Sequence, residues 1–219
     1  DLSLKALSQI NKLKSFLVIN RDIFIRTLCL TFAFGFFYSQ SSAGGETILA
    51  VNVILLQFLN WMSYGVDGFA FASESLVGKY KGAQNDKNLK LSIQYSFGWG
   101  IGLALLFSFL YLFFGNQLVT LFSETGDHHL VKAAEPFLFW MVLFPVLSTP
   151  SYIWDGVYIG LTASTAMRNT MVLALICYLG FHFWLFPIYG NQGLWGAFLI
   201  FMVLRGMFQW LWYIFKLKT

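Results

Sequence analysis

The chain has 219 residues, of which 58% are hydrophobic and 11% are charged, and its formal net charge is +4. Soluble domains contain about 25% charged residues, so this composition excludes an ordinary water-soluble core. The basic residues concentrate in the segments between apolar stretches. That distribution indicates contact with a lipid bilayer and its anionic headgroups, and it gives no indication of a nucleic-acid partner.

Residues 1–21 precede the first apolar stretch. Their leucines and lysines have the spacing of an amphipathic helix that lies along the cytoplasmic headgroups, and a plain interdomain linker is the alternative. The chain opens at Asp1 with neither an initiator methionine nor a signal peptide. We therefore expect it to be a piece of a longer protein.

Six apolar stretches follow, each near the ~20 residues that a helix needs to cross a bilayer. Unpaired backbone groups are costly in lipid, and the stretches do not alternate as barrel strands do, so we predict an all-α integral membrane fold. The predicted transmembrane helices cover residues 22–40, 47–78, 91–114, 136–161, 168–188 and 193–215, and residues 216–219 form a cytoplasmic tail.

Two of these regions have additional features. The connection before the fourth predicted helix is the longest one, and we expect it to form a short surface helix, a turn and a helix start with Pro136 in its first turn. Within the fourth predicted helix, Pro145 and Pro150 remove backbone donors. This helix is therefore expected to be bent or locally unwound.

The basic residues predict how the chain lies in the membrane. Six crossings place both ends of the chain on the same side. Of the 14 Lys and Arg, 11 lie in segments on that side, and only Lys132 lies in an opposite connection. By the positive-inside rule, both termini are cytoplasmic.

Polar side chains within the predicted helices are the candidate functional residues. An ionisable group at membrane depth costs at least about 2.5 kcal/mol, so those present usually face a cavity or a partner. On the second predicted helix the polar residues that share one face are Asn52, Asn60, Ser63, Asp67 and Glu74. We favour the wall of a wet cavity over a closed helix seam for this face, although Glu74 near the cytoplasmic rim is also explained as a solvated charge.

Asp155 follows the two prolines of the fourth predicted helix and lies beside Tyr152. A carboxylate next to interrupted helix can hold an ion or a substrate together with the freed backbone groups. The alternative is that Asp155 only pairs within the helix bundle, with Arg26 or Arg168 as its partner.

Arg205 lies about eleven residues into the last predicted helix, close to the bilayer midplane. At that depth it needs an anion or water, and pairing with an aspartate is favoured over contact with substrate. Arg26 lies within a turn of the cytoplasmic border and is expected to reach the headgroups.

Sequence signals for enzymatic chemistry are absent. His182 has no acidic or histidine neighbour at helical spacing, so we expect packing and no metal site. The sequence contains no phosphate-binding loop and no G-x-S-x-G or H-E-x-x-H motif. We therefore predict no catalytic residues and no cofactor, and we expect any transport to be driven by an ion gradient.

Five stretches resemble a known family. They are NRDI at residues 20–23, LAVN at 49–52, YGVDGFAFASE at 64–74, DGVYIGLTA at 155–163 and AMRN at 166–169. Together they resemble the C-terminal half of a DinF-like member of the multidrug and toxic compound extrusion (MATE) family. The combination of D-G-F-A-F-A-x-E with D-G-x-x-I-G and A-M-R-N is fairly specific to that branch.

The resemblance implies a twelve-helix antiporter in the bacterial inner membrane, with two six-helix lobes around a central cleft. This chain would be the second lobe, and the N-terminal six-helix lobe would be its partner within the same polypeptide. Such antiporters export organic, often cationic or amphipathic, compounds in exchange for H⁺ or Na⁺.

The resemblance also bears on the acidic residues. In the DinF-like branch a key titrating aspartate is usually on the first helix of the first lobe, outside this sequence. Relatives from other branches use acidic residues of the seventh, eighth and tenth helices. The first predicted helix of this chain, which would be the seventh of the whole transporter, has a single acidic residue, Asp22, at its start. Asp67 and Asp155 match the aspartates of the D-G stretches of the branch.

Two other functions are weighed against the antiporter. A lipid-linked oligosaccharide flippase of the same superfamily typically has a strongly basic cavity, and this chain offers few central cations beyond Arg205. An intramembrane enzyme would use His182 or the carboxylates, yet no nucleophile and base occur at a usable spacing.

Overall fold

The computed structural model describes residues 2–123 and 128–217, with side chains described at residues 16–123 and 128–216. Helices account for nearly all of these residues, and no strand occurs among them. The elements in chain order are α1 (Leu2–Ala43), α2 (Glu46–Gly82), α3 (Asp86–Phe122), α4 (His128–Ala134), the 3-10 helix η1 (Glu135–Phe137), α5 (Leu138–Gly160), α6 (Ser164–Tyr189), α7 (Asn191–Trp212) and the π-helix η2 (Tyr213–Leu217).

Five helical segments in the described part of the chain are long and apolar enough to cross a membrane: Glu46–Gly82, Asp86–Phe122, His128–Gly160, Ser164–Tyr189 and Asn191–Lys216. The helix α1 is longer still, with 42 residues. The predicted all-α integral membrane fold is therefore confirmed.

Several helices extend beyond the predicted ranges. The helix α1 continues without a break through residues 21 and 22, where the sequence suggested a boundary between linker and span. Residues 115–122, expected in a separate surface helix, form the last two turns of α3. Hydropathy marks only the part of a helix that suits lipid, whereas capping sets its ends. At the start of α3, for example, the Asn85 side chain accepts a hydrogen bond from the backbone N–H of Asn88.

Both prolines of α5 lie inside an unbroken α-helix, so of the two expected distortions, a bend or local unwinding, the unwinding does not occur. Three neighbouring helices pack against α5, namely α2, α3 and α7. Such packing can hold a proline-containing helix together despite its missing backbone donors.

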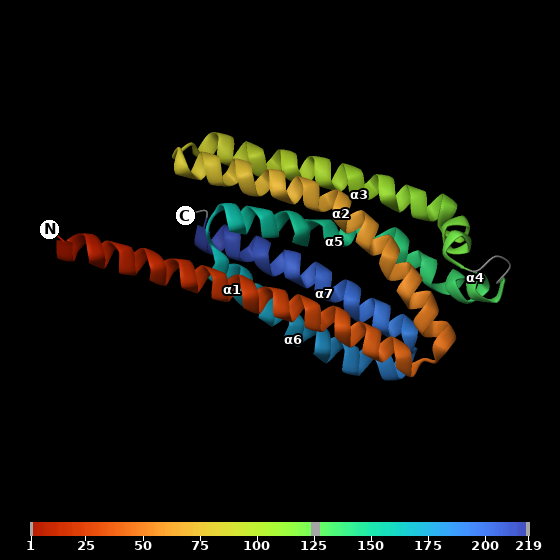
Figure 1. Ribbon diagram of the computed structural model, residues 1–219. Coiled ribbons are helices and arrows are strands. Elements are labelled where there is room, and N and C mark those ends of the chain that lie inside the picture. Colours follow the sequence, from red (N-terminus) through yellow and green to blue (C-terminus); the bar gives the residue numbers. More distant parts are fainter. Residues whose placement is uncertain (1, 124–127, 218–219) are drawn as a thin grey trace.

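The six long helices pack side by side: α5 lies against α2, α3 and α7, α6 lies against α7 and α1, and α2 also lies against α3 (Figure 1). Both termini, the α2–α3 turn and the α5–α6 turn lie at one end of the molecule (Figure 1). The basic residues of those connections therefore share that end: Lys79, Lys81, Lys87, Lys90 and Arg168. This agrees with the predicted sidedness, and the cytoplasmic assignment of this end stays a prediction.

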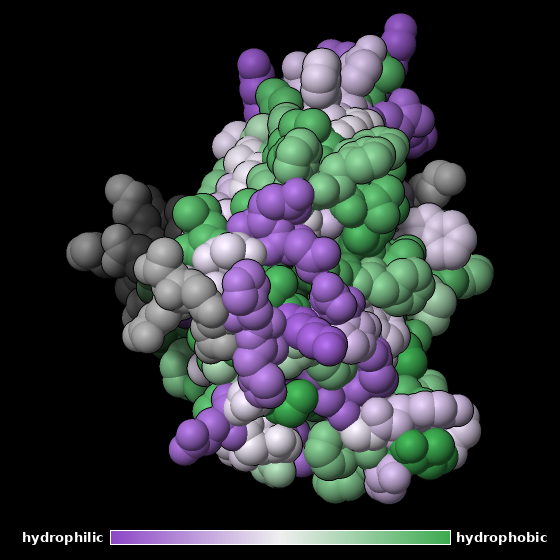
Figure 2. Space-filling model, turned by 90° about the vertical axis from the view of Figure 1, so that its right-hand side faces the viewer, coloured by the Kyte–Doolittle hydropathy of each residue, from purple (hydrophilic) through white to green (hydrophobic). Residues whose placement is uncertain are grey.

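The opposite end carries the α1–α2 turn and α4. Figure 2 views the molecule from this end and shows hydrophilic residues gathered across its middle, with hydrophobic residues beside them. Exposed phenylalanines and leucines are common along the helices, including Phe109, Phe113 and Phe183. Large apolar side chains exposed along helices of this length suit lipid as the surrounding solvent.

The closest approach of α2 and α5 depends on two glycines. A Cβ atom added at Gly160 would lie 2.6 Å from the backbone oxygen of Glu74, and one added at Gly156 would lie 2.8 Å from the carbonyl carbon of Ala70 and closer still to its oxygen. In lipid, small residues allow such backbone contact and the dispersion attraction that comes with it. The D-G-x-x-I-G stretch thus sets the spacing of the two helices that bear Asp155 and Asp67.

Candidate functional site

A buried network of charged and polar groups connects three helices around Asp155. This carboxylate on α5 forms ion pairs with Arg26 of α1 and Arg205 of α7, and it accepts a hydrogen bond of 2.6 Å from Nε2 of Gln209. Asp155 is 6% exposed and Arg205 is completely buried. The expected pairing of Arg205 with an aspartate is confirmed.

Helical spacing explains how α5 and α7 supply these groups. Arg205 and Gln209 are four residues apart on α7, so their side chains lie on the same face. Tyr152 precedes Asp155 by three residues, and the Arg205 guanidinium lies over its ring, 5.3 Å from the ring centre. The ring supplies a further favourable contact to this buried cation.

Asp67 of α2 lies near the same arginines but is not bound to them. Its charge interacts with those of Arg26 and Arg205, yet among the described residues it forms no ion pair and no hydrogen bond. The side chain is only partly buried. Two arginines and two aspartates therefore balance in charge, while only one of the carboxylates is held by direct partners.

Asp155 and Asp67 can have different roles, because over the described part of the chain Asp155 is held by direct partners and Asp67 is not. Removing one partner of a buried ion pair costs about 3–5 kcal/mol, so Asp155 is bound tightly to α1 and α7. Within the described structure, the Nε atoms of Arg26 and Arg205 and Oε1 of Gln209 are buried without a hydrogen-bond partner. The network thus has two arginine donors and one amide acceptor left over, and the nearby Asp67 carboxylate is a further acceptor without a direct partner in the described structure.

Asn52 belongs to a different cluster at the other end of the lobe. It is fully buried, donates to Oδ1 of Asn191 at 2.7 Å and to Oγ of Ser41 at 2.8 Å, and accepts from Nε1 of Trp195 at 2.9 Å. It precedes Asp67 by 15 residues, which is about 22 Å along a helix. Because three neighbours occupy its donors and its acceptor, Asn52 joins α1, α2 and α7 at the end of the molecule that carries the α1–α2 turn.

The remaining predicted site residues of α2 lie on either side of Asp67. Asn60 and Glu74 are partly exposed, and each is seven residues from Asp67, or about 10 Å along the helix. Asn60 donates to Oε1 of Gln57 at 3.4 Å, and Glu74 has no ion pair within the described residues. The structure therefore brings Asp67 together with Tyr152, Asp155 and Arg205, and places Asn52, Asn60 and Glu74 apart from them.

Sequence reasoning missed one member of the Asp155 network, Gln209, and left Arg26 open between the headgroups and Asp155. The expectation that Arg26 reaches the headgroups is wrong, because its guanidinium turns inward to Asp155. Pairing of Asp155 with Arg26 had been one of the open alternatives, and the other partner, Arg168, binds Asp22 instead. Gln209 had a detectable signal, since it lies one helical turn after Arg205 on the same face.

Asp22 forms a second buried contact at the end that holds the termini. It is completely buried and accepts hydrogen bonds of 2.6 Å from Nη1 of Arg168 and from Oγ1 of Thr165. These contacts join the NRDI stretch on α1 to the AMRN stretch on α6. The opposite charges of Asp22 and Arg168, both near the same membrane border, were the sequence signal for this pairing.

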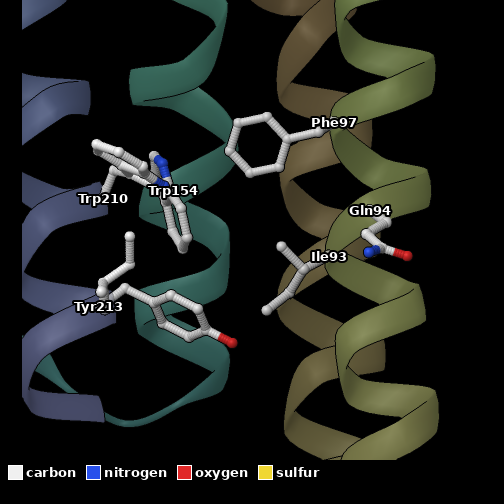
Figure 3. A pocket seen from close by; sticks show the side chains of 7 residues that line it. Ile93, Gln94, Phe97, Trp154, Trp210 and Tyr213 are labelled. Atoms are coloured by element: carbon white, nitrogen blue, oxygen red, sulfur yellow. The ribbon is translucent and has the colours of Figure 1, made fainter. Parts of the chain in front are cut away.

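A cavity of about 430 Å³ lies between α3, α5 and the end of α7. In Figure 3, the rings of Trp154 and Tyr213 point across it toward Phe97 and Ile93 of α3. Its wall is almost entirely apolar and includes neither Asp67 nor Asp155. Over the described residues, no group of three or more His, Cys, Asp or Glu side chains could hold a metal ion.

The helices and their apolar surfaces define a multi-pass membrane protein. The family model described as MatE matches residues 23–188, and the chain therefore belongs to the MatE family. Family membership confirms the resemblance found in the sequence.

Individual relatives agree with this assignment. DNA damage-inducible protein F of Escherichia coli (strain K12) is 36% identical over 193 residues, which cover 87% of this chain and 41% of that protein. The solved structure "Crystal structure of MATE in the bent conformation" matches with a TM-score of 0.80 at 19% identity, over 94% of this chain and 46% of that one. A second, "Inward-facing conformation of a multidrug resistance MATE family transporter of the MOP superfamily", matches with a TM-score of 0.78 at 20% identity, over 89% and 45%. The chain thus spans less than half the length of these relatives.

Proposed function

We propose that this chain is the second six-helix lobe of a twelve-helix antiporter in the bacterial inner membrane. The whole transporter exports organic, cationic or amphipathic compounds in exchange for H⁺ or Na⁺, and both termini of this chain are cytoplasmic. Membership of the MatE family, and a match to less than half of each relative, support this proposal. An N-terminal six-helix lobe completes the central cleft in this arrangement.

The contrast between the two aspartates supports a role for Asp67 in ion coupling. Asp155 is bound by two arginines and Gln209, whereas Asp67 is partly exposed and has no direct partner in the described structure. Binding of H⁺ or Na⁺ to Asp67 neutralises a charge beside Arg26 and Arg205 without breaking an existing ion pair. Such a change alters the relative free energy of two lobe arrangements, which is the requirement for coupled exchange.

The other predicted site residues have separate roles in this proposal. Asn60 and Glu74 extend the partly exposed polar side of α2 toward its two ends and supply a path for ions or substrate. Tyr152 and Arg205 position Asp155, and Asn52 orders the outer ends of the helices. Aromatic side chains offer an organic cation both apolar area and ring faces.

Substitution of Asp67 in the full-length protein tests this proposal. We expect Asp67→Asn to fold normally and to lose the dependence of substrate uptake on the ion gradient in proteoliposomes. The matched control is Glu46→Gln, which removes an exposed carboxylate from the first turn of the same helix and should keep that dependence. Uptake by the Asp67→Asn protein with an unchanged response to H⁺ and Na⁺ gradients would contradict the proposal.

The flippase alternative is weakened by the charge balance of the network. The structure adds Arg26 to Arg205 as a central cation, but the two are matched by Asp155 and Asp67. A cavity that binds the diphosphate of a lipid-linked sugar needs an excess of positive charge, and this network does not supply one.

A further inference from the structure

A groove of about 620 Å³ lies between α1 and α6 near the end of the molecule that holds the termini. Its charged side chains are Arg21 and Arg168, and its apolar wall includes Ile25, Val172 and Ile176. The groove is separate from the Asp155 network.

The positive charge of the groove exceeds its negative charge. Both arginines contact the same oxygen, Oδ1 of Asp22, with Nη1 of Arg168 at 2.6 Å and Nη2 of Arg21 at 3.1 Å. Nε and Nη2 of Arg168 also donate to Oδ1 of Asn169. Arg168 is therefore held in place, whereas the Arg21 side chain is 58% exposed and can offer donors to an added anion.

The apolar wall continues from the arginines toward the middle of the membrane. Ile25 follows Arg21 by four residues on α1, and on α6 Val172 and Ile176 follow Arg168 at the same spacing. Residues four apart share a helix face, so each helix has an arginine at the border and apolar side chains below it. The row on α6 runs about 12 Å from Arg168 to Ile176. Ile176 is 62% exposed, so this wall is open to an occupant.

We propose that this groove binds an anionic phospholipid of the leaflet that faces the basic end of the protein. The headgroup phosphate contacts Arg21 and Arg168, and one acyl chain lies along Ile25, Val172 and Ile176. The groove and the lipid match in charge and in shape. A phospholipid has its negative phosphate at the membrane border, where the arginines lie, and its apolar chains deeper in the membrane, where the isoleucines and the valine lie. Basic pockets between transmembrane helices bind anionic headgroups by the same chemistry.

The bound lipid adds to the contact between α1 and α6. It bridges Arg21 of α1 and Arg168 of α6 beside the ion pair of Arg168 with Asp22, and it covers apolar side chains on both helices. The proposal depends on the membrane fold and on the basic end, and it does not depend on the direction or coupling of transport.

Native mass spectrometry of the full-length protein tests the charged part of the site. The detergent-solubilised protein is titrated with dioleoylphosphatidylglycerol and, separately, with dioleoylphosphatidylcholine. We expect phosphatidylglycerol to bind more tightly than phosphatidylcholine. Arg21→Gln should weaken phosphatidylglycerol binding about fivefold, because a basic residue near a membrane surface contributes about 1 kcal/mol. The control Lys87→Gln removes an exposed cation of the same end outside the groove and should leave binding unchanged.

A second variant tests the apolar part of the site. Ile176→Trp fills the groove without changing its charge, and the exposure of Ile176 makes a loss of folding unexpected. We expect it to weaken phosphatidylglycerol binding while the melting temperature of the lipid-free protein stays the same. The proposal is overturned by equal binding of the two lipids to the unmodified protein, by equal losses in Arg21→Gln and Lys87→Gln, or by undiminished binding in Ile176→Trp.

Discussion

Replacement of Gly156 by alanine tests whether close contact of α2 and α5 holds the lobe together. The new Cβ atom would lie 2.8 Å from the carbonyl carbon of Ala70 and closer still to its oxygen, whereas two carbon atoms prefer at least about 3.5 Å, so the helices must separate by more than roughly 0.7 Å. The obstacle is backbone and cannot rotate away. Gly160, one turn further on, also lies against the backbone of α2, which prevents α5 from tilting to relieve the clash.

We expect this substitution to cost about 3 kcal/mol, the upper part of the range for overpacking. When this lobe unfolds as one unit, that corresponds to a fall in melting temperature of roughly 6–12 °C. The assay is thermal unfolding of the full-length protein in detergent, followed by size-exclusion chromatography. Gly102→Ala is the matched control, because its Cβ would meet nothing within 4 Å. Equal melting temperatures for Gly156→Ala and Gly102→Ala would refute the reasoning.

Three further substitutions test individual contacts by the same unfolding assay. Asp155→Asn leaves two inward-facing arginines without their counter-ion and should cost about 3–5 kcal/mol, so a stability equal to that of the unmodified protein would contradict the network. Asn52→Ala removes the hydrogen-bond acceptor of the buried Trp195 N–H and should lower the free energy of unfolding by about 2 kcal/mol. Transport per folded molecule should stay unchanged. Tyr111→Phe removes a buried hydrogen bond of 2.6 Å to a backbone carbonyl and should cost about 1 kcal/mol, whereas Tyr95→Phe, at an exposed position, should cost nothing measurable.

Several properties of the site could be predicted from the sequence, and others could not. Asp155 and Arg205 were identified as candidates because a charge at membrane depth needs a partner wherever the helix lies. The partners themselves were only partly predicted. Arg26 is 129 residues from Asp155 in the chain, and its position near a predicted border suggested the headgroups. Its inward direction results from the packing of α1 against α6, α2 and α7, which brings the Arg26 side chain to Asp155 of α5.

The polar face of α2 shows the same limit. Helical periodicity correctly places Asn52 and Asp67 on one side of a helix, because that relation is local. It does not say which neighbour each residue meets. Asn52 contacts Asn191, which is 139 residues away, and is completely buried, whereas Asp67 remains partly exposed beside two arginines. A helix that crosses several neighbours gives different surroundings to residues on one face.

The sequence by itself determined the class of fold, the membrane-length helices and the family. Lipid offers no hydrogen bonds to the backbone, so long apolar stretches have no alternative to the helix, and short motifs suffice to mark the family. Only the tertiary structure decided which carboxylate is held by ion pairs and which is open, and where two helices leave a basic groove. Those features depend on how the helices rotate and pack against each other, and the pattern along a single helix does not contain that information.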